Sequence, residues 1–461
     1  MRSFFGGVRM EDRKVRTREK AIEELCPKQV VLPLSGEKGQ EGLSLVNVGD
    51  RVDLGQKIGA SQDGASVVHA TVSGTVKAVE PRLCAGGKKR LSIVIENDGE
   101  ERWSSALLPP LDPETLDPET LIRRVREAGI VGMGGASFPT DRKLSGGLGK
   151  VRTVIVNGAE CEPYLTCDER VMLERPEQVI GGAVILARLF RVDKVIIAVE
   201  ENKSAGIKAL RQEIQTQGAP VVVEVLRERY PQGGEKQLCQ TLTGRQIPAG
   251  GLAVDLGCLV LNLSTVCAMD QAVRLGRPLL RRVVTVSGPG VQRPGNLDCP
   301  IGTLCSELLD HCGVREEMDR LVLGGPMMGR AQSSAEVPVE KGIGGVLAFC
   351  GIEPEPPAEP RCIRCGRCVS VCPMHLEPLF LYEDVQHRRT ARLREGHLMD
   401  CIECGACAYR CPARLELVQM IRSGKQLLWK EQLVQERGRR EVAQEPSRAQ
   451  EKRTKRRRET R

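Results

Sequence analysis

Eight cysteines near the C-terminal end of the chain fall into two copies of one spacing, C-x2-C-x2-C-x3-C-P. Three closely spaced thiolates can hold three corners of one 4Fe–4S cube, and in chains with two such runs the fourth cysteine ligates the other cube. The proline after each fourth cysteine stiffens the backbone there. The sequence therefore predicts two 4Fe–4S clusters with crossed ligands: one held by Cys362, Cys365, Cys368 and Cys411, the other by Cys372, Cys401, Cys404 and Cys407.

Two other interpretations of the quartets stay open from spacing alone: a pair of four-thiolate zinc sites, or disulfides. The 28-residue spacer between the quartets contains PLFLYEDVQ and ARLREGHLMD, which are helical in character. Its length favours a mainly α-helical two-cluster module over a compact β type. We place this module at residues 355–432.

Length and hydropathy exclude several classes. A chain of 461 residues exceeds a single core, so several domains are expected. The start, MRSFFGGVRMEDRK, lacks the apolar region of a signal peptide. The longest apolar run, Val179–Phe190, is shorter than the roughly 20 residues that span a bilayer. A cytosolic protein with reduced thiols is expected.

The net charge of +8 is concentrated in the last 25 residues. Residues 437–461 carry eleven Lys/Arg and four Asp/Glu, which leaves 57 basic and 56 acidic residues in the rest of the chain. We predict a disordered tail over residues 433–461, either inert or attracted to an anionic lipid surface or acidic partner. With 3% aromatic residues and no basic face in the body, nucleic-acid binding is not expected.

The N-terminal part begins with a charged arm, residues 1–25. Short β-type runs broken by glycine follow over residues 26–107. The phrase V-G-D-x-V-x-x-G-Q-x-I, followed by H-A-x-V-S-G-T-V, resembles the barrel-sandwich hybrid domains of biotinyl and lipoyl carriers. The connecting turn, SQDGAS, has no lysine to modify. A scaffold is therefore favoured over a swinging arm.

After a proline-rich linker, strands and helices alternate. Apolar runs at 151–157, 194–200, 221–226 and 258–263 are separated by predicted helices at 169–189, 203–217, about 234–242, and 265–275. This pattern predicts a multidomain α/β and α+β chain whose second domain, residues 115–280, contains a doubly covered parallel sheet. Short strands at 281–350 have the look of a β-grasp domain of the soluble-ligand-binding (SLBB) type, to which we assign a docking or scaffolding role.

A ligand site is expected in the α/β domain. In GIVGMGGASFPTDRKL (129–144), the glycines let backbone N–H groups approach a ligand closely. The spacing is not the G-x-G-x-x-G fingerprint of an ordinary dinucleotide fold, and a purely structural loop is possible. The next block, NGAECEPYLTCDERVML (157–173), ends a buried strand, and open parallel sheets bind ligands at such ends.

These blocks resemble a known family. GMGGASFPTDRK and NGAECEPYLT are similar to the flavin segments of the NADH-binding flavoprotein subunit of respiratory complex I. The resemblance is closer to the RnfC subunit of the Rnf ion-translocating ferredoxin:NAD oxidoreductase complex, which shares the same order of domains. YPQGGEKQL (230–238) and GGPMMG (324–329) also match that family. The resemblance covers roughly residues 26–430 and leaves out the arm and the tail.

The resemblance implies a site for FMN and NAD(H). Glu162 would lie near the nicotinamide and is the expected catalytic residue. The chain departs from the complex I pattern at Met133, Ser137 and Ala159, where arginine, glycine and aspartate are usual. The other expected contacts to flavin or nucleotide are Gly132, Gly134, Gly135, Ala136, Lys143, Asn157, Glu160, Glu235, Asn262 and Thr265.

The resemblance also implies a function. The chain would be the peripheral electron-input subunit of a hetero-oligomer at the cytoplasmic face of the membrane. It would pass electrons between NAD(H) and ferredoxin through FMN and two 4Fe–4S clusters, while integral-membrane and flavin-carrying partners move Na+ or H+. Two alternatives remain open: a soluble NADH-dependent cobalamin reductase, and an electron-transfer subunit with a vestigial nucleotide pocket.

Overall fold

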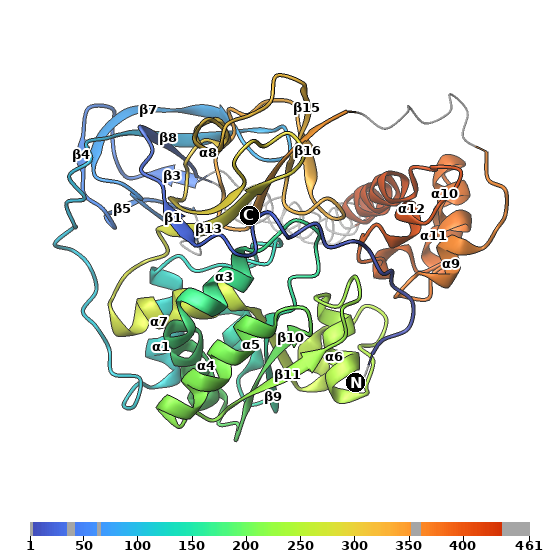
Figure 1. Ribbon diagram of the computed structural model, residues 1–461, viewed down its shortest axis with the longest axis horizontal. Coiled ribbons are helices and arrows are strands. Elements are labelled where there is room, and N and C mark those ends of the chain that lie inside the picture. Colours follow the sequence, from blue (N-terminus) through green and yellow to red (C-terminus); the bar gives the residue numbers. More distant parts are fainter. Residues whose placement is uncertain (1–2, 35–41, 62–65, 352–360, 436–461) are drawn as a thin grey trace, which may run out of the picture. The chain divides into compact units, whose positions relative to one another are not determined.

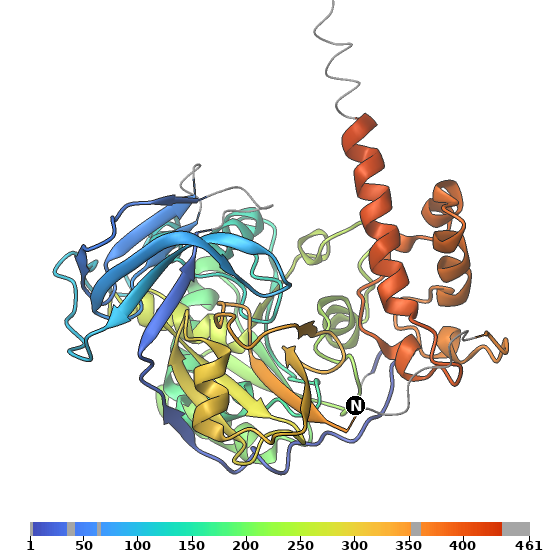
Figure 2. The same cartoon turned by 90° about the horizontal axis from the view of Figure 1, so that it is seen from above.

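The computed structural model describes residues 3–34, 42–61, 66–351 and 361–435. The chain forms two compact units, Met1–Glu355 and Pro356–Arg461, each described by itself below (Figures 1 and 2). Among the described residues, none of the helices has the length and apolar character needed to cross a bilayer.

The centre of the first unit is a parallel sheet with strand order β11-β10-β9-β12. Successive side chains alternate between its faces. Val154 and Val156 pack in the core that includes α4 and α7, whereas Ile155 and Val260 pack with α6. This confirms the doubly covered α/β sheet. The elements are β9 (Thr153–Gly158), β10 (Val195–Glu200), β11 (Val221–Leu226), β12 (Cys258–Asn262), α4 (Pro176–Phe190), α5 (Ser204–Gln217), α6 (Glu235–Thr243) and α7 (Leu263–Arg274).

The single helix predicted at 169–189 is wrong in one respect, because the structure divides it into α3 (Cys167–Glu174) and α4. Arg175 between them has a non-helical backbone (φ −138°), and Pro176 begins the second helix. A proline disfavours helical geometry in the residue before it and fits well in a first turn. The first of the two helices, α3, begins at the end of the loop that follows β9.

Two further helices flank the glycine-rich segment. α1 (Pro118–Glu127) begins at Asp117, whose side chain accepts a hydrogen bond from the N–H of Thr120. α2 (Thr140–Gly147) begins directly after the segment that contains the glycines. The glycine-rich segment is therefore a loop between two helices.

The barrel-sandwich part contains two small antiparallel sheets with Val30, Ile58 and Ile93 fully buried. Most of the SQDGAS turn lies outside the described residues. The strands are β2 (Gln29–Pro33), β3 (Gly42–Ser44), β4 (Arg51–Val52), β5 (Lys57–Ser61), β6 (Val67–His69), β7 (Gly74–Leu83) and β8 (Lys89–Asn97).

A six-stranded mixed sheet completes the first unit, in the order β1-β14-β13-β17-β15-β16. Its first strand comes from the N-terminal arm and pairs in parallel with β14. The arm is therefore built into this sheet. The elements are β1 (Ile22–Glu24), β13 (Arg281–Ser287), β14 (Gly295–Pro300), β15 (Met318–Leu323), β16 (Arg330–Gln332), β17 (Gly345–Cys350) and α8 (Cys305–Cys312).

The described residues of the second unit form helices, as the spacer predicted. Leu381, Leu393 and Leu428 are among the side chains of its buried core. The elements are α9 (Arg367–Ser370), α10 (Pro378–Gln386), α11 (Thr390–Glu395), η3 (Leu398–Asp400), α12 (Ala406–Tyr409) and a final helix over 417–435, which is the long red helix of Figure 2.

Candidate functional site

The glycine loop, residues 132–137, is held by two hydrogen bonds between the backbone of Met133 and side chains of α7 and β13. The backbone N–H of Met133 donates to Thr265 Oγ1 at 2.9 Å, and the buried Arg282 donates to Met133 O at 2.7 Å. Asn262 ends β12 and caps α7, with its side-chain oxygen accepting from the N–H of Thr265. Two of the expected cofactor residues, Asn262 and Thr265, thus lie directly beneath the loop.

The rim of the same loop is open. Gly134, Gly135 and Ala136 are exposed, and their backbone N–H groups donate to no acceptor in the part of the chain that the structure describes. A Cβ on Gly135 (φ +114°) would have no atom within 4 Å. Unpaired amides beside the N-terminus of α2 fit an anionic phosphate, as the flavin prediction requires.

Ser137 has a left-handed backbone (φ +51°), a conformation that glycine adopts with less strain. Its hydroxyl lies against Gly342, where an added Cβ would come within 2.4 Å of Ser137 Oγ. The departure from glycine at this position therefore places a side chain against the loop that precedes β17.

Asn157 is the second-last residue of β9, and Glu160 follows the strand. The Asn157 amide donates to Gly233 O at 2.8 Å. The carboxylate of Glu160 accepts from the N–H groups of Asp168 (2.8 Å) and Glu169 (3.2 Å). It therefore caps α3, and its expected hydrogen bond to flavin stays a prediction.

Glu162 is held by the turn between β15 and β16. Its carboxylate accepts from the backbone N–H groups of Met327 (3.0 Å) and Met328 (2.9 Å). A Cβ on Gly325 would lie 2.2 Å from Glu162 Oε2, so this approach requires glycine. Burial raises the pKa of Glu162 to about 7, although the two backbone hydrogen bonds oppose the rise. The segment for which a docking or scaffolding role was expected thus supplies two backbone N–H groups to a candidate site residue.

Lys143 and Glu235 meet at the surface. Lys143 Nζ lies 2.8 Å from Glu235 Oε1, and both side chains are partly exposed. The pair joins α2 to the first residue of α6. These two expected nucleotide contacts are therefore neighbours across the rim of the site.

The sequence analysis did not identify three polar residues of this region. Lys14, in the arm, is buried and donates from Nζ to Glu160 O at 2.5 Å. Burial lowers its pKa. Asp168 is buried between Ser264 Oγ (2.6 Å) and the Asn262 amide (2.8 Å), and Arg282 lies below the loop. No local pattern distinguishes a buried lysine or arginine from its exposed neighbours.

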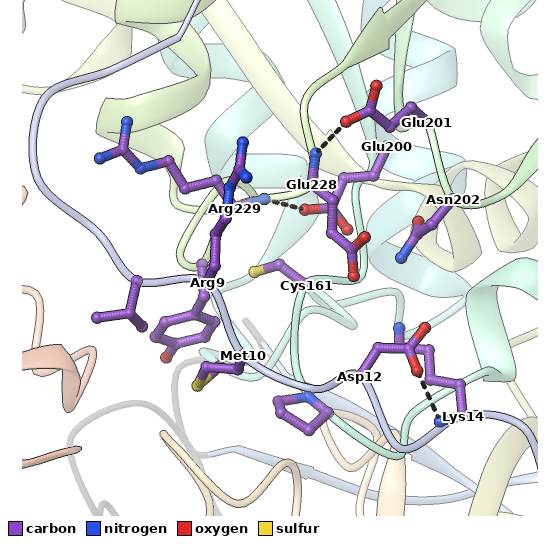
Figure 3. A pocket seen from close by; sticks show the side chains of 13 residues that line it. Arg9, Met10, Asp12, Lys14, Cys161, Glu200, Glu201, Asn202, Glu228 and Arg229 are labelled. Atoms are coloured by element: carbon purple, nitrogen blue, oxygen red, sulfur yellow. Dashed lines mark hydrogen bonds between the residues drawn. The ribbon is translucent and has the colours of Figure 1, made fainter. Parts of the chain in front are cut away.

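A pocket of about 240 Å³ lies between the arm and the carboxyl ends of β10 and β11 (Figure 3). Its lining includes Arg9 and Lys14 from the arm, and Glu200 and Arg229 from the segments at the strand ends. Glu200 is bonded to Lys203, with Nζ and Oε2 3.1 Å apart. None of the expected cofactor residues lines this pocket.

The second unit brings the cysteines of the predicted second cluster together. Burial and the neighbouring Cys401 and Cys372 thiols raise the pKa of Cys404 to about 12. Cys407 is affected by the same neighbours and by Cys404. The fourth cysteine of the first run thus lies beside three cysteines of the second run.

Of the other predicted set, Cys368 and Cys411 lie in one cluster of side chains, which also contains Cys407, so the crossing of the ligands stays a prediction. Within the described ranges, no three His, Cys, Asp or Glu side chains are arranged to hold a single metal ion.

Four family models match the chain. They describe an RnfC barrel-sandwich hybrid domain (residues 2–100), a Nuo51 FMN-binding domain (125–271), an SLBB domain (283–331) and a 4Fe-4S dicluster domain (361–415). The first match begins at residue 2, so the arm lies inside the resemblance and the expectation that it lies outside was wrong.

Curated relatives match most of the chain. The C-subunit of the ion-translocating oxidoreductase complex of Rhodobacter capsulatus is 43% identical over 86% of this chain and 76% of its own length. The C-subunit of the proton-translocating ferredoxin:NAD(+) oxidoreductase complex of Clostridium ljungdahlii is 40% identical (83% and 84%). The Na(+)-translocating counterpart of Acetobacterium woodii is 39% identical (92% and 96%).

Proposed function

The chain belongs to the family of C-subunits of ion-translocating ferredoxin:NAD(+) oxidoreductase complexes, and from this premise we propose its role. It is the subunit that passes electrons between NAD(H) and ferredoxin-type carriers. It works in a hetero-oligomer whose integral-membrane subunits move Na+ or H+, and it lies at the cytoplasmic face of the membrane as a peripheral subunit.

One observation carries the proposal. A single chain combines a glycine loop with unpaired amides at the carboxyl edge of a parallel sheet and two cysteine quartets in a separate unit. Bound FMN would connect the two-electron chemistry of NAD(H) to the one-electron chemistry of the two 4Fe–4S clusters. Neither half alone would serve both kinds of electron transfer.

Residues at different positions in the candidate site have different proposed roles. The amides of Gly134, Gly135 and Ala136 would bind phosphate, while Thr265 and Arg282 hold the loop from below. The remaining expected contacts at the strand ends and the rim are Gly132, Lys143, Asn157, Glu160, Glu235 and Asn262.

Glu162 is assigned to the nicotinamide side of the site. Its carboxyl is held by two backbone amides, and its pKa of about 7 lets it hold or release a proton near neutrality. The four cysteines of each crossed set would hold one 4Fe–4S cluster.

The test is reduction of an artificial dye by NADH, with the purified full chain after reconstitution with iron, sulfide and FMN. The proposal expects NADH-dependent dye reduction that requires FMN. Failure after complete reconstitution would leave an electron-transfer subunit without a working nucleotide site. Co-purification with hydrophobic subunits supports the complex, whereas a free protein that reduces cobalamin would contradict it.

A further inference from the structure

The two cysteine runs are local repeats of each other. C-I-R-C-G-R-C at 362–368 corresponds to C-I-E-C-G-A-C at 401–407. Arg364 (φ +53°) and Glu403 (φ +56°) hold equivalent positions, and each donates its backbone N–H to the Sγ of the first cysteine, at 3.3 and 3.4 Å. The backbone of the repeat is therefore the same, and the side chains at matched positions can be compared directly.

The two cysteine runs differ in their contacts with the final helix, residues 417–435. Glu403 is bonded by Arg422 (2.9 Å) and Lys425 (2.8 Å) from the helix over 417–435, and Lys425 also donates to Cys401 O at 2.6 Å. Arg364 is exposed and has no such partner within the described ranges. The final helix thus closes over the second run and leaves the first run open.

The cysteines follow the same division. Cys362 and Cys365 are exposed, whereas Cys404 and Cys407 are buried. Electron transfer between proteins needs one centre close to the surface. Of the two quartets, the one that begins at Cys362 meets this need.

The two segments around the open quartet carry only basic side chains, and the exposed Glu377 and Glu416 adjoin them. Residues 361–376 and 406–415 contain five arginines and no aspartate or glutamate. Arg364, Arg367 and Arg410 are exposed and form no ion pair in the part of the chain described. The two segments adjoin, because α9 contacts α12, and Cys368 and Cys411 lie in one cluster of side chains. A cluster of arginines attracts an acidic surface.

Apolar side chains lie among these arginines. Ile363, Val369 and Tyr409 are 67%, 39% and 52% exposed. Arginine and tyrosine are enriched at the centres of protein interfaces, where apolar groups supply contact area. Such a composition suits a protein partner.

We propose that the surface formed by Arg364, Arg367, Arg410, Ile363, Val369 and Tyr409, called here the first-quartet face, docks an electron-carrier protein with an acidic surface. The inference rests on the proposed function. The exposed Cys362 and Cys365 decide the class of partner, because a cluster held there would exchange electrons only with a partner that has a redox centre, and a lipid surface has none. The arginines guide association and set its orientation.

The test uses the full, cluster-loaded chain and a small acidic two-cluster ferredoxin as the probe, with affinity measured calorimetrically at low and moderate salt. The variant is Arg364→Gln/Arg367→Gln. The matched control is Arg388→Gln/Lys430→Gln, which removes the same charge from exposed positions. Arg388 also shares the left-handed backbone of Arg364, with φ values of 51° and 53°.

The first-quartet variant is expected to bind about tenfold more weakly and to lose most of its salt dependence, while the control stays within about twofold of the original chain. Iron content confirms that both variants keep their clusters. Equal weakening in variant and control, or no binding of ferredoxin by the unaltered chain, would overturn the proposal. Binding to phosphatidylserine vesicles that the variant loses, in place of ferredoxin binding, would overturn it as well.

NADH-driven dye reduction, measured on the same samples, separates the two conclusions. If the dye is reduced and ferredoxin is not bound, the docking inference alone fails. If the unaltered chain does not reduce the dye, the proposed function fails whatever the outcome of the binding experiment.

Discussion

The carboxylate of Glu162 accepts a hydrogen bond of 2.9 Å from the backbone N–H of Met328, although 166 positions separate the two residues in the chain. The contact places the turn between β15 and β16 against the loop that follows β9. Met327 makes the equivalent bond to the other carboxylate oxygen. A segment to which the sequence assigned a docking or scaffolding role thus holds the side chain of Glu162, the residue predicted to be catalytic.

The first prediction concerns the pH dependence of stability. Glu162 has a pKa of about 7, raised by burial from 4.5, so the folded chain holds a proton that the unfolded chain releases earlier. The stabilisation is complete below pH 4.5 and is lost as pH rises through 7, by roughly 3 kcal/mol in total. Glu162→Gln should therefore gain thermal stability relative to the original chain between pH 5 and 8. A constant difference in Tm across that range would contradict the assignment.

The second prediction concerns the hydroxyl of Thr265. Thr265→Val keeps the shape of the side chain but removes the acceptor of the Met133 N–H, which costs about 1–3 kcal/mol when a donor is left buried. We expect a looser glycine loop and weaker FMN binding in a fluorescence titration. Thr265→Ser keeps the hydroxyl and should restore most of the affinity. Equal affinity in the valine and serine variants would show that the hydroxyl does not position the loop.

The third prediction concerns Lys14, a buried residue of the arm. Lys14→Met removes the donor to Glu160 O and leaves the nearby Glu160 carboxylate without its cation, 3.9 Å away. Breaking a buried pair in this way costs about 3–5 kcal/mol, so the Tm should fall by several degrees. Lys20→Met changes an exposed lysine of the same arm and should leave the Tm unchanged. Similar Tm values for the two variants would place Lys14 outside the structural framework.

The fourth prediction tests the crossing of the cluster ligands. Cys411→Ser should perturb the same electron paramagnetic resonance signal as Cys365→Ser, because the two residues belong to one cluster. Cys372→Ser should instead match Cys404→Ser. Each variant should fall below the roughly eight irons per chain of two cubes, while Cys26→Ser keeps them. If Cys411→Ser grouped with Cys404→Ser, the ligands would not be crossed.

The pattern of residues along the chain was enough for several features of the fold. The alternation of apolar runs and helices predicted the parallel sheet covered on both faces. This was possible because the length of each apolar run and the spacing of apolar residues within it are local features of the sequence. The spacing of the cysteines predicted the two quartets for the same reason. The break at Pro176 could also have been predicted from the sequence. The prediction of a single helix across it did not take into account that a proline disfavours helical geometry in the residue before it.

The tertiary structure alone decided which polar groups meet. Sequence could not show that Glu162 faces the Met327 and Met328 amides, that Lys14 is buried against Glu160, or that Cys362 is exposed while Cys404 is buried. Local backbone preferences and ligand spacing depend on neighbours a few residues away, so they can be predicted from the sequence. Burial, pKa and the charge of a surface depend on segments hundreds of residues apart, and these are set only when the chain packs.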